Sequence, residues 1–298
     1  MFVSKTDHGQ TISFLLGKAG AYFQLLKFRL SFLVSFSSAI GFILAKPSLL
    51  WQEVFWIMLG GLLVTGSANI INQIAEKDLD KLMKRTAKRP LPTGVLSENE
   101  AFVFCVVLGM SGLTILALMF NVLTAVLSLF SLILYAFLYT PLKRTSPICV
   151  FVGAIPGGLP PLIGWVAATG QIGVEAWILF GIQFIWQFPH FWAIAWVLDE
   201  DYKKAGFKML PMAGGKNLKT AFQIMIYTLL LIPLSMLPLK FGMTGINSAM
   251  IAVICGILFL IQTLYLMQTC SKKAAMNIMF GSFLYLPIVQ IAFVLDKL

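Results

Sequence analysis

The residues best placed to do chemistry lie between Asn72 and Gly94, where a long apolar run gives way to charged residues. Asn72, Glu76 and Asp80 are spaced at i, i+4 and i+8, so on a helix they share one face. Oxygen ligands suit a hard divalent cation, and Mg²⁺ commonly reaches phosphates through one or two carboxylates and water. This spacing therefore favours a Mg²⁺ site for a phosphorylated ligand, the alternative being a solvated, salt-bridged loop.

Basic residues follow the acids in the same stretch, and two more come after a later apolar run. The candidates for binding an anion are Arg85, Arg89, Lys143 and Arg144. The planar fork of arginine suits phosphate oxygens, whereas lysine acts as a point charge. A departing diphosphate gains negative charge, which fixed cations stabilise. We interpret the four as a diphosphate clamp; anchoring at a membrane surface is the alternative.

A second acidic cluster, Asp199, Glu200 and Asp201, also follows an apolar run and precedes basic residues. On its own, such a cluster is more typical of a solvated surface. If the apolar runs span a membrane, both acidic clusters lie at the same depth in it. They then fit two halves of one diphosphate site.

The elements that must position these residues are long apolar segments. Of the 298 residues, 59% are hydrophobic and 11% are charged, and the mean hydropathy is +0.88. This composition is not that of a soluble domain, and several runs approach the ~20 residues with which a helix spans a bilayer. We expect an all-α integral membrane protein with nine spans, at about 25–45, 51–75, 99–119, 121–140, 149–169, 174–198, 218–238, 243–270 and 275–295.

Local signals refine this arrangement. Ser97 and Glu100 have the spacing of a capping box that opens the third span. Prolines inside two spans predict kinks, with neighbouring helices satisfying the freed backbone groups: Pro156, Pro160, Pro161 and Pro189. The four cysteines are scattered, which predicts neither a disulfide framework nor a cysteine metal site. Residues 1–20 read as a flexible polar arm without a cleavable signal peptide, and residues 21–298 as a single transmembrane domain.

The basic residues also predict the orientation. With nine spans, 19 of the 22 Lys and Arg residues fall on the side of the N-terminus. The positive-inside rule then places the N-terminus and every charged motif in the cytoplasm, with the chain in the inner (cytoplasmic) membrane. The net charge of +10 is attributed to these loops and to anionic lipid, and no nucleic-acid binding is expected.

Four motifs in order resemble a known family over about residues 25–293. They are NQIAEKDLDKLMKRTAKRPLPTG (Asn72–Gly94), YTPLKRTSP (Tyr139–Pro147), GAIPGGLPPLIGW (Gly153–Trp165) and WQFPHFWAIAWVLDEDYKKAGFKMLP (Trp186–Pro211). Together they resemble the UbiA superfamily of intramembrane prenyltransferases, and within it the members that farnesylate protoheme IX. One departure is Glu76, since the first acid of the superfamily pattern is usually Asp.

The resemblance implies a helical bundle around a central cavity open to the cytoplasmic side. It implies transfer of a farnesyl group from farnesyl diphosphate to a vinyl group of protoheme IX, giving haem O and diphosphate. The implied Mg²⁺ ligands and catalytic residues are Asn72, Glu76, Asp80 and Asp201. The implied substrate-binding residues are Arg85, Arg89, Lys143, Arg144, His190, Tyr139 and Tyr202. The implied partners are the two substrates, the lipid bilayer and a haem-handling membrane protein such as haem A synthase.

His190 is one of two histidines, and the other, His8, lies in the N-terminal arm. A lone histidine in a helix more often packs through a hydrogen bond than binds a ligand. The resemblance to haem-farnesylating enzymes adds a second interpretation, contact with the haem through its iron or a propionate. Both interpretations stay open.

Two other functions fit parts of the sequence. A UbiA-type prenyltransferase with an aromatic quinone precursor as acceptor would use the same acids, and only the resemblance of the RTxxRPLPTG, PHFW and MLP motifs favours haem. A transporter usually carries ionisable groups or broken helices near the middle of the bilayer. Here the expected spans are almost free of charge in their middle, which disfavours transport.

Overall fold

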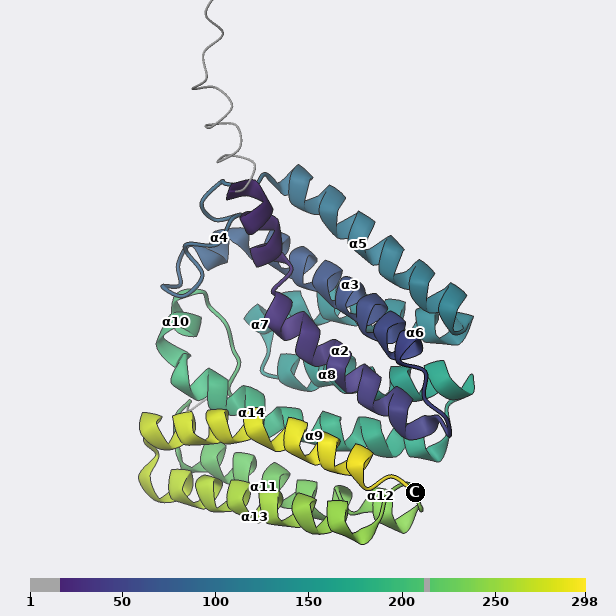
Figure 1. Cartoon of the computed structure of the whole chain (residues 1–298). Coiled ribbons are helices and arrows are strands. Elements are labelled where there is room, and N and C mark those ends of the chain that lie inside the picture. The colour runs from purple at the N-terminus through teal and green to yellow at the C-terminus, as the bar shows by residue number, and fades with distance from the viewer. Residues whose placement is uncertain (1–16, 212–214) are drawn as a thin grey trace, which may run out of the picture.

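The computed structural model describes residues 17–211 and 215–298. The helices are α2 (Phe28–Ala45), α3 (Trp51–Ala75), α4 (Lys77–Asp80), α5 (Glu98–Met119), α6 (Val122–Ile133), the π-helix η1 (Leu134–Tyr139), α7 (Thr140–Thr145), α8 (Cys149–Thr169), α9 (Val174–Val197), α10 (Asp199–Lys204), α11 (Leu218–Leu234), α12 (Leu237–Lys240), α13 (Ile246–Thr269) and α14 (Lys272–Leu295). Within the described ranges, nine helical segments are long and apolar enough to cross a membrane, with α6, η1 and α7 forming one and α11 and α12 another. The predicted nine-span, all-helical fold is confirmed (Figure 1).

The chain enters the bundle through a short helix, residues 17–25, which a turn separates from α2. Residues 1–16 of the predicted arm lie outside the described residues, and residues 17–20 belong to this helix rather than to an irregular arm. The turn ends at Lys27, whose φ of 46° lies in the left-handed region. Residues with a side chain adopt that region uncommonly, and such positions cluster at functional sites.

Glycines let α2 and α8 approach closely. A Cβ atom at Gly41 would lie 1.9 Å from the carbonyl oxygen of Pro161, and one at Gly164 would lie 1.8 Å from that of Ser38. Neither position leaves room for a side chain, so the two backbones are in contact. Small residues at the contact are the usual means by which membrane helices pack.

The prolines of α8 lie within one unbroken helix, and a side chain from α9 satisfies a carbonyl that they release. Pro161 cannot donate to the carbonyl of Gly157, which instead accepts a hydrogen bond of 2.8 Å from Nε2 of Gln183. The Gln183 side chain accepts in turn from Gln290 of α14 at 2.9 Å, and Gln290 is bonded to Ser37 of α2 at 3.2 Å. The expectation that neighbouring helices would satisfy freed backbone groups is therefore confirmed at this proline.

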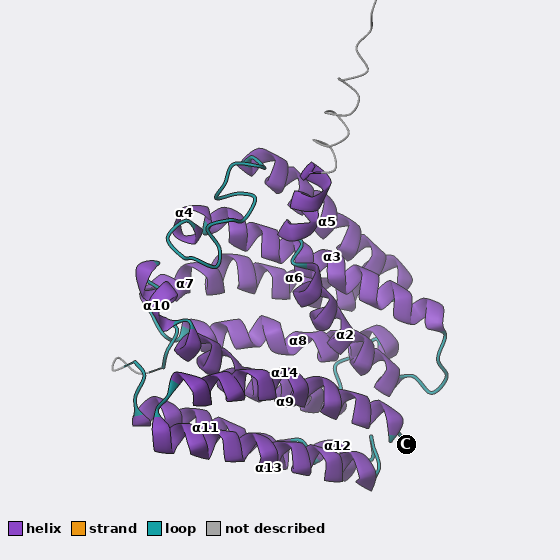
Figure 2. Cartoon of the chain, turned by 60° about the vertical axis from the view of Figure 1, so that its left-hand side comes forward, coloured by secondary structure: helices purple, strands orange, loops and turns teal. Residues whose placement is uncertain are grey.

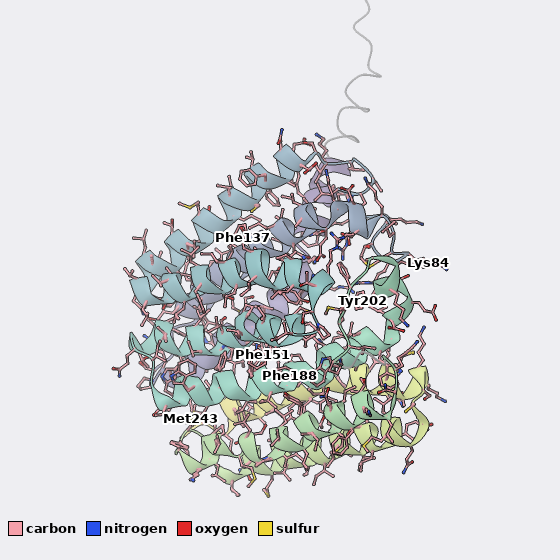
Figure 3. The ribbon with its side chains drawn as sticks, turned by 180° about the vertical axis from the view of Figure 1, so that it is seen from behind. Lys84, Phe137, Phe151, Phe188, Tyr202 and Met243 are labelled. Carbon is pink, nitrogen blue, oxygen red and sulfur yellow. The ribbon has the colours of Figure 1, made fainter. Side chains whose placement is uncertain are left out.

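Most charged segments gather at one end of the bundle, opposite the C-terminus (Figure 1). Most helices in the described part are joined by short loops at the two ends, whereas longer connections, residues 81–97 and 205–217, follow α4 and α10 at the charged end (Figure 2). Tyr202 of α10 and Lys84 of the loop after α4 lie at the same end, whereas Met243 lies near the other (Figure 3). The predicted capping box is present: Ser97 Oγ accepts from the backbone of Glu100, whose side chain accepts from the backbone of Ser97.

Candidate active site

One cavity of about 190 Å³ at the charged end brings together eight of the eleven predicted site residues. They are Asn72, Glu76, Asp80, Arg85, Arg89, Tyr139, Lys143 and Tyr202. These residues come from three stretches that lie far apart in the sequence: α3 and α4 with the following loop, η1 with α7, and α10. The bundle therefore closes its charged segments around a single small, polar space.

The three predicted metal ligands follow a helix that is interrupted once. Helix α3 ends at Ala75, Glu76 leaves the helical region with φ −104° and ψ 7°, and α4 begins at the next residue. Backbone hydrogen bonds still join Glu76 to Asn72 at 3.0 Å and Asp80 to Glu76 at 2.8 Å. The i, i+4, i+8 relation thus survives the break, and all three side chains line the cavity.

Both carboxylates are buried and each is bound to a cation from elsewhere in the chain. Lys143 Nζ lies 2.8 Å from Oε1 of Glu76, and Arg89 Nη1 lies 2.7 Å from Oδ2 of Asp80. Glu76 is 5% exposed and Asp80 1%. The second oxygen of Asp80, Oδ1, is buried without a hydrogen-bond partner among the described residues. A buried carboxylate oxygen without a donor is costly and is suited to a cation.

The π-helix η1 turns two tyrosines toward the carboxylates. Tyr135 and Tyr139 both line the cavity. Lys143 Nζ lies 4.6 Å from the ring centre of Tyr139 and 5.7 Å from that of Phe207, so it is held between aromatic faces as well as by Glu76. A π-turn inside a helix is rare and is frequent at functional sites. Here it sets the register that places the lysine against the acid.

Lys27 is a cavity residue that the sequence did not single out. Burial, together with the positive charges of Arg89 and Lys143, lowers the pKa of its amine to about 7. Its backbone is left-handed, and a lysine before an apolar run carries no signal for that conformation. Tyr135 was also missed. Burial raises the pKa of Tyr202, so this cavity residue keeps its hydroxyl proton at neutral pH.

The other three predicted residues do not line this cavity: Asp201, Arg144 and His190. Asp201 is next to Tyr202 on α10, but its carboxylate faces Lys204 at 3.8 Å and is absent from the cavity wall. Arg144 lines a separate groove. Asp201 as a metal ligand and Arg144 as part of the diphosphate clamp therefore remain predictions that this arrangement does not support.

His190 is held by packing contacts among the described residues. Its Nδ1 is 2.8 Å from Oγ of Ser282, and its ring stacks on Trp186 with centres 4.5 Å apart. This is the hydrogen-bonded packing interpretation of a lone histidine. Contact with haem stays a prediction.

Among the described residues, no group of three or more His, Cys, Asp or Glu side chains is placed to hold a metal ion. The cavity instead offers two carboxylates and one amide oxygen beside four basic side chains. That set matches the way in which Mg²⁺ is usually bound, with few protein ligands and the rest from water and phosphate.

Comparison with known proteins shows the family to which the chain belongs. The UbiA prenyltransferase family matches residues 34–286. The chain belongs to that family. It is 58% identical over 279 residues to the protoheme IX farnesyltransferase of Cytophaga hutchinsonii, covering 93% of this chain and 98% of that protein. Identity to the protoheme IX farnesyltransferase of Flavobacterium psychrophilum is 44% over 282 residues, covering 92% and 93%. The UbiA protein described here is thus a multi-pass membrane prenyltransferase.

Solved structures share the UbiA fold. A digeranylgeranylglyceryl phosphate synthase superposes with a TM-score of 0.77 at 24% identity, covering 94% of this chain and 98% of that one. A UbiA homologue from Archaeoglobus fulgidus, bound to DMAPP and Mg²⁺, superposes with a TM-score of 0.63 at 17% identity, covering 91% and 98%. At these identities the likeness establishes the fold alone.

Proposed function

We propose that this UbiA protein transfers the farnesyl group of farnesyl diphosphate to a vinyl group of protoheme IX, giving haem O and diphosphate. One observation carries the proposal: two buried carboxylates face four basic side chains in one cavity at the end of an apolar bundle. The choice of substrates is supported by relatives that are named protoheme IX farnesyltransferase and match nearly the whole chain.

Asn72, Glu76 and Asp80 would hold Mg²⁺, with the partnerless Oδ1 of Asp80 as the most available oxygen. When bound, this ion neutralises a diphosphate and withdraws charge from the oxygen that leaves the allylic carbon. Support for the metal comes from the donor set and from the Archaeoglobus fulgidus homologue, whose structure contains Mg²⁺.

Binding of Mg²⁺ and diphosphate requires the carboxylates of Glu76 and Asp80 to exchange their present partners. Lys143 and Arg89 now neutralise Glu76 and Asp80. In the bound state we expect these two acids to face the metal ion, while the two cations turn to diphosphate oxygens. The charges of the two ion pairs cancel at present. In the bound state Mg²⁺ would offset the two acids, and Arg85 would join Lys143 and Arg89 opposite the diphosphate, so no buried charge is left alone. We therefore expect Mg²⁺ and diphosphate to increase each other's affinity.

In the remaining steps, bonds break and form between the two organic substrates. The cavity residues stabilise the charges that develop. The bond between C1 and the diphosphate oxygen breaks, and the bonding electrons leave with diphosphate, which Arg85, Arg89 and Lys143 stabilise. Ring faces of Tyr135 and Tyr139 suit the positive charge that develops on the allyl group. The terminal vinyl carbon of the haem then bonds to C1. Water adds to the neighbouring carbon and loses a proton, which completes the hydroxyethyl group.

The test is a reaction of purified protein with labelled farnesyl diphosphate and haem, with Mg²⁺ or with a chelator. The expected result is haem O that carries the label, formed only with the metal. Prenylation of an aromatic acid without haem O would identify the acceptor of the alternative instead. Absence of both products from folded protein would contradict prenyl transfer by this cavity.

We further propose that the chain lies in the inner membrane with this cavity toward the cytoplasm. The excess of basic residues on the N-terminal side supports this orientation. Partnership with a haem A synthase stays a prediction from the resemblance.

A further inference from the structure

A second groove, of about 570 Å³, shares Glu76 with the active-site cavity. It lies between the α3–α4 junction and the η1–α7 segment. Its walls are mostly apolar, with Leu79, Ala136 and Phe137 among them, and Arg144 is the only basic residue among the described residues that line it. The groove therefore combines an apolar surface with a single cation.

The Arg144 side chain is exposed and makes no ion pair or hydrogen bond with the described part of the chain. Its neighbour Lys143 is bound to Glu76, which is the only acid that lines the groove. The charge of Arg144 is thus not neutralised by the protein. Because Arg144 lies at the end of the fourth span, Val122–Thr145, its guanidinium falls at the membrane interface.

An apolar strip leads from the groove along the same span. Phe130, Ile133 and Phe137 are 47%, 45% and 65% exposed on successive turns of α6 and η1. Figure 3 labels Phe137 on this span, between the charged end marked by Tyr202 and the far end marked by Met243. Exposed side chains of this kind face acyl chains in a membrane protein.

We propose that this groove binds an anionic phospholipid, with its phosphate on Arg144 and one acyl chain along α6. The uncompensated arginine selects for negative charge, since its fork can donate two hydrogen bonds to a phosphate. Two contacts between α3 and the η1–α7 segment lie where the groove and the active-site cavity meet: Asn72 of the cavity wall donates to Thr140 of the groove wall at 3.2 Å, and Lys143 pairs with the shared Glu76 at 2.8 Å. A lipid would thus support the backbone that carries Glu76 without entering the cavity.

The test is native mass spectrometry of the purified full chain, equilibrated with equal amounts of phosphatidylglycerol and phosphatidylcholine. Arg144→Gln should retain about fivefold less phosphatidylglycerol, which corresponds to the ~1 kcal/mol of one basic residue at an anionic surface. Its phosphatidylcholine should not change. Arg144→Lys should keep part of the preference. The matched control is Lys273→Gln, because Lys273 is an exposed basic residue in the first turn of α14.

Equal retention by the wild type and Arg144→Gln would overturn the proposal, as would an equal loss in Lys273→Gln. Calorimetry with inorganic diphosphate and Mg²⁺ on the same variants separates this question from the reaction itself. Arg144→Gln should bind the diphosphate as the wild type does. Loss of diphosphate binding with normal lipid retention would return Arg144 to the diphosphate clamp and exclude the lipid site.

Discussion

Two acidic residues at the charged end of the bundle, Glu76 and Asp201, differ in where their cations come from. Glu76 is bound to Lys143, which is 67 residues away in the chain. On α10, by contrast, Asp201 faces Lys204 three residues along the same helix. The first kind of pair exists only because the fold brings two elements together, whereas the second needs only a helix.

Burial separates Glu76 and Asp80 from Asp201 as well, whereas Asp199 on α10 is buried and pairs with Lys203 and with Lys216 beyond its helix. The side chains of Glu76 and Asp80 are 7% and 1% exposed, while that of Asp201 is 19% exposed and its partner Lys204 50%. Burying an ion pair costs desolvation that its attraction does not reliably recover, so such a pair is weak evidence for stability. Pairs on an exposed helix cost little and contribute little. The comparison therefore assigns function to Glu76 and Asp80 and a largely local role to Asp201.

The sharpest test of that assignment is Asp80→Asn. The amide keeps the shape of the side chain but removes the charge from the oxygen best placed for a cation, Oδ1. We expect turnover to fall about 10²- to 10³-fold, the usual loss when one preorganised electrostatic group is removed. The measurement is haem O formed at saturating Mg²⁺, with gel filtration showing that the variant is folded. Activity near that of the wild type would take Asp80 out of the metal site.

Lys143→Met is expected to act on stability as well as on activity. It leaves the buried Glu76 carboxylate without its cation, and breaking such a pair from one side costs ~3 kcal/mol or more. The measurement is the thermal unfolding midpoint in detergent. The double variant Glu76→Gln/Lys143→Met removes both charges and should recover most of the lost stability while remaining inactive. If the two single losses simply add in the double variant, the buried pair is not the cause.

A third prediction concerns the length of the acidic side chain at position 76. Asp is the usual acid at this position of the family pattern, so Glu76→Asp keeps the charge and loses one methylene. We expect it to retain about tenfold more activity than Glu76→Ala, roughly the effect of 1.4 kcal/mol on a rate. The measurement is the steady-state rate of haem O formation by Glu76→Asp and Glu76→Ala. Equal losses would mean that the distance to Lys143, and not the charge alone, is what the site requires.

Much of this arrangement could be predicted from the sequence because it depends on local patterns. Apolar runs near 20 residues define the spans, and the spacing of Asn72, Glu76 and Asp80 predicts a shared face that survives the break at Glu76. The capping box at Ser97 is local in the same sense.

What could not be predicted depends on backbone geometry and long-range packing. Lys27 reaches the cavity through a left-handed turn, and Tyr135 through a π-helix, and neither conformation has a residue type that signals it. Arg144 and Asp201 lie next to the cavity residues Lys143 and Tyr202 in sequence, yet point elsewhere. Neighbouring residues on a helix face different directions, so a motif identifies a site only to within a turn.

Asp201→Asn is the variant on which the comparison depends most and for which the smallest effect is expected. The sequence predicts it to be a metal ligand, in which case it should be as damaging as Asp80→Asn. The structure instead places its carboxylate 3.8 Å from an exposed lysine of the same helix, an arrangement that contributes ~1 kcal/mol at most. We therefore expect turnover within about threefold of the wild type and an unchanged Mg²⁺ requirement. A loss of 10²-fold or more, with a higher Mg²⁺ concentration needed for half-maximal rate, would show that α10 moves inward when substrate binds, making the two acidic clusters one site.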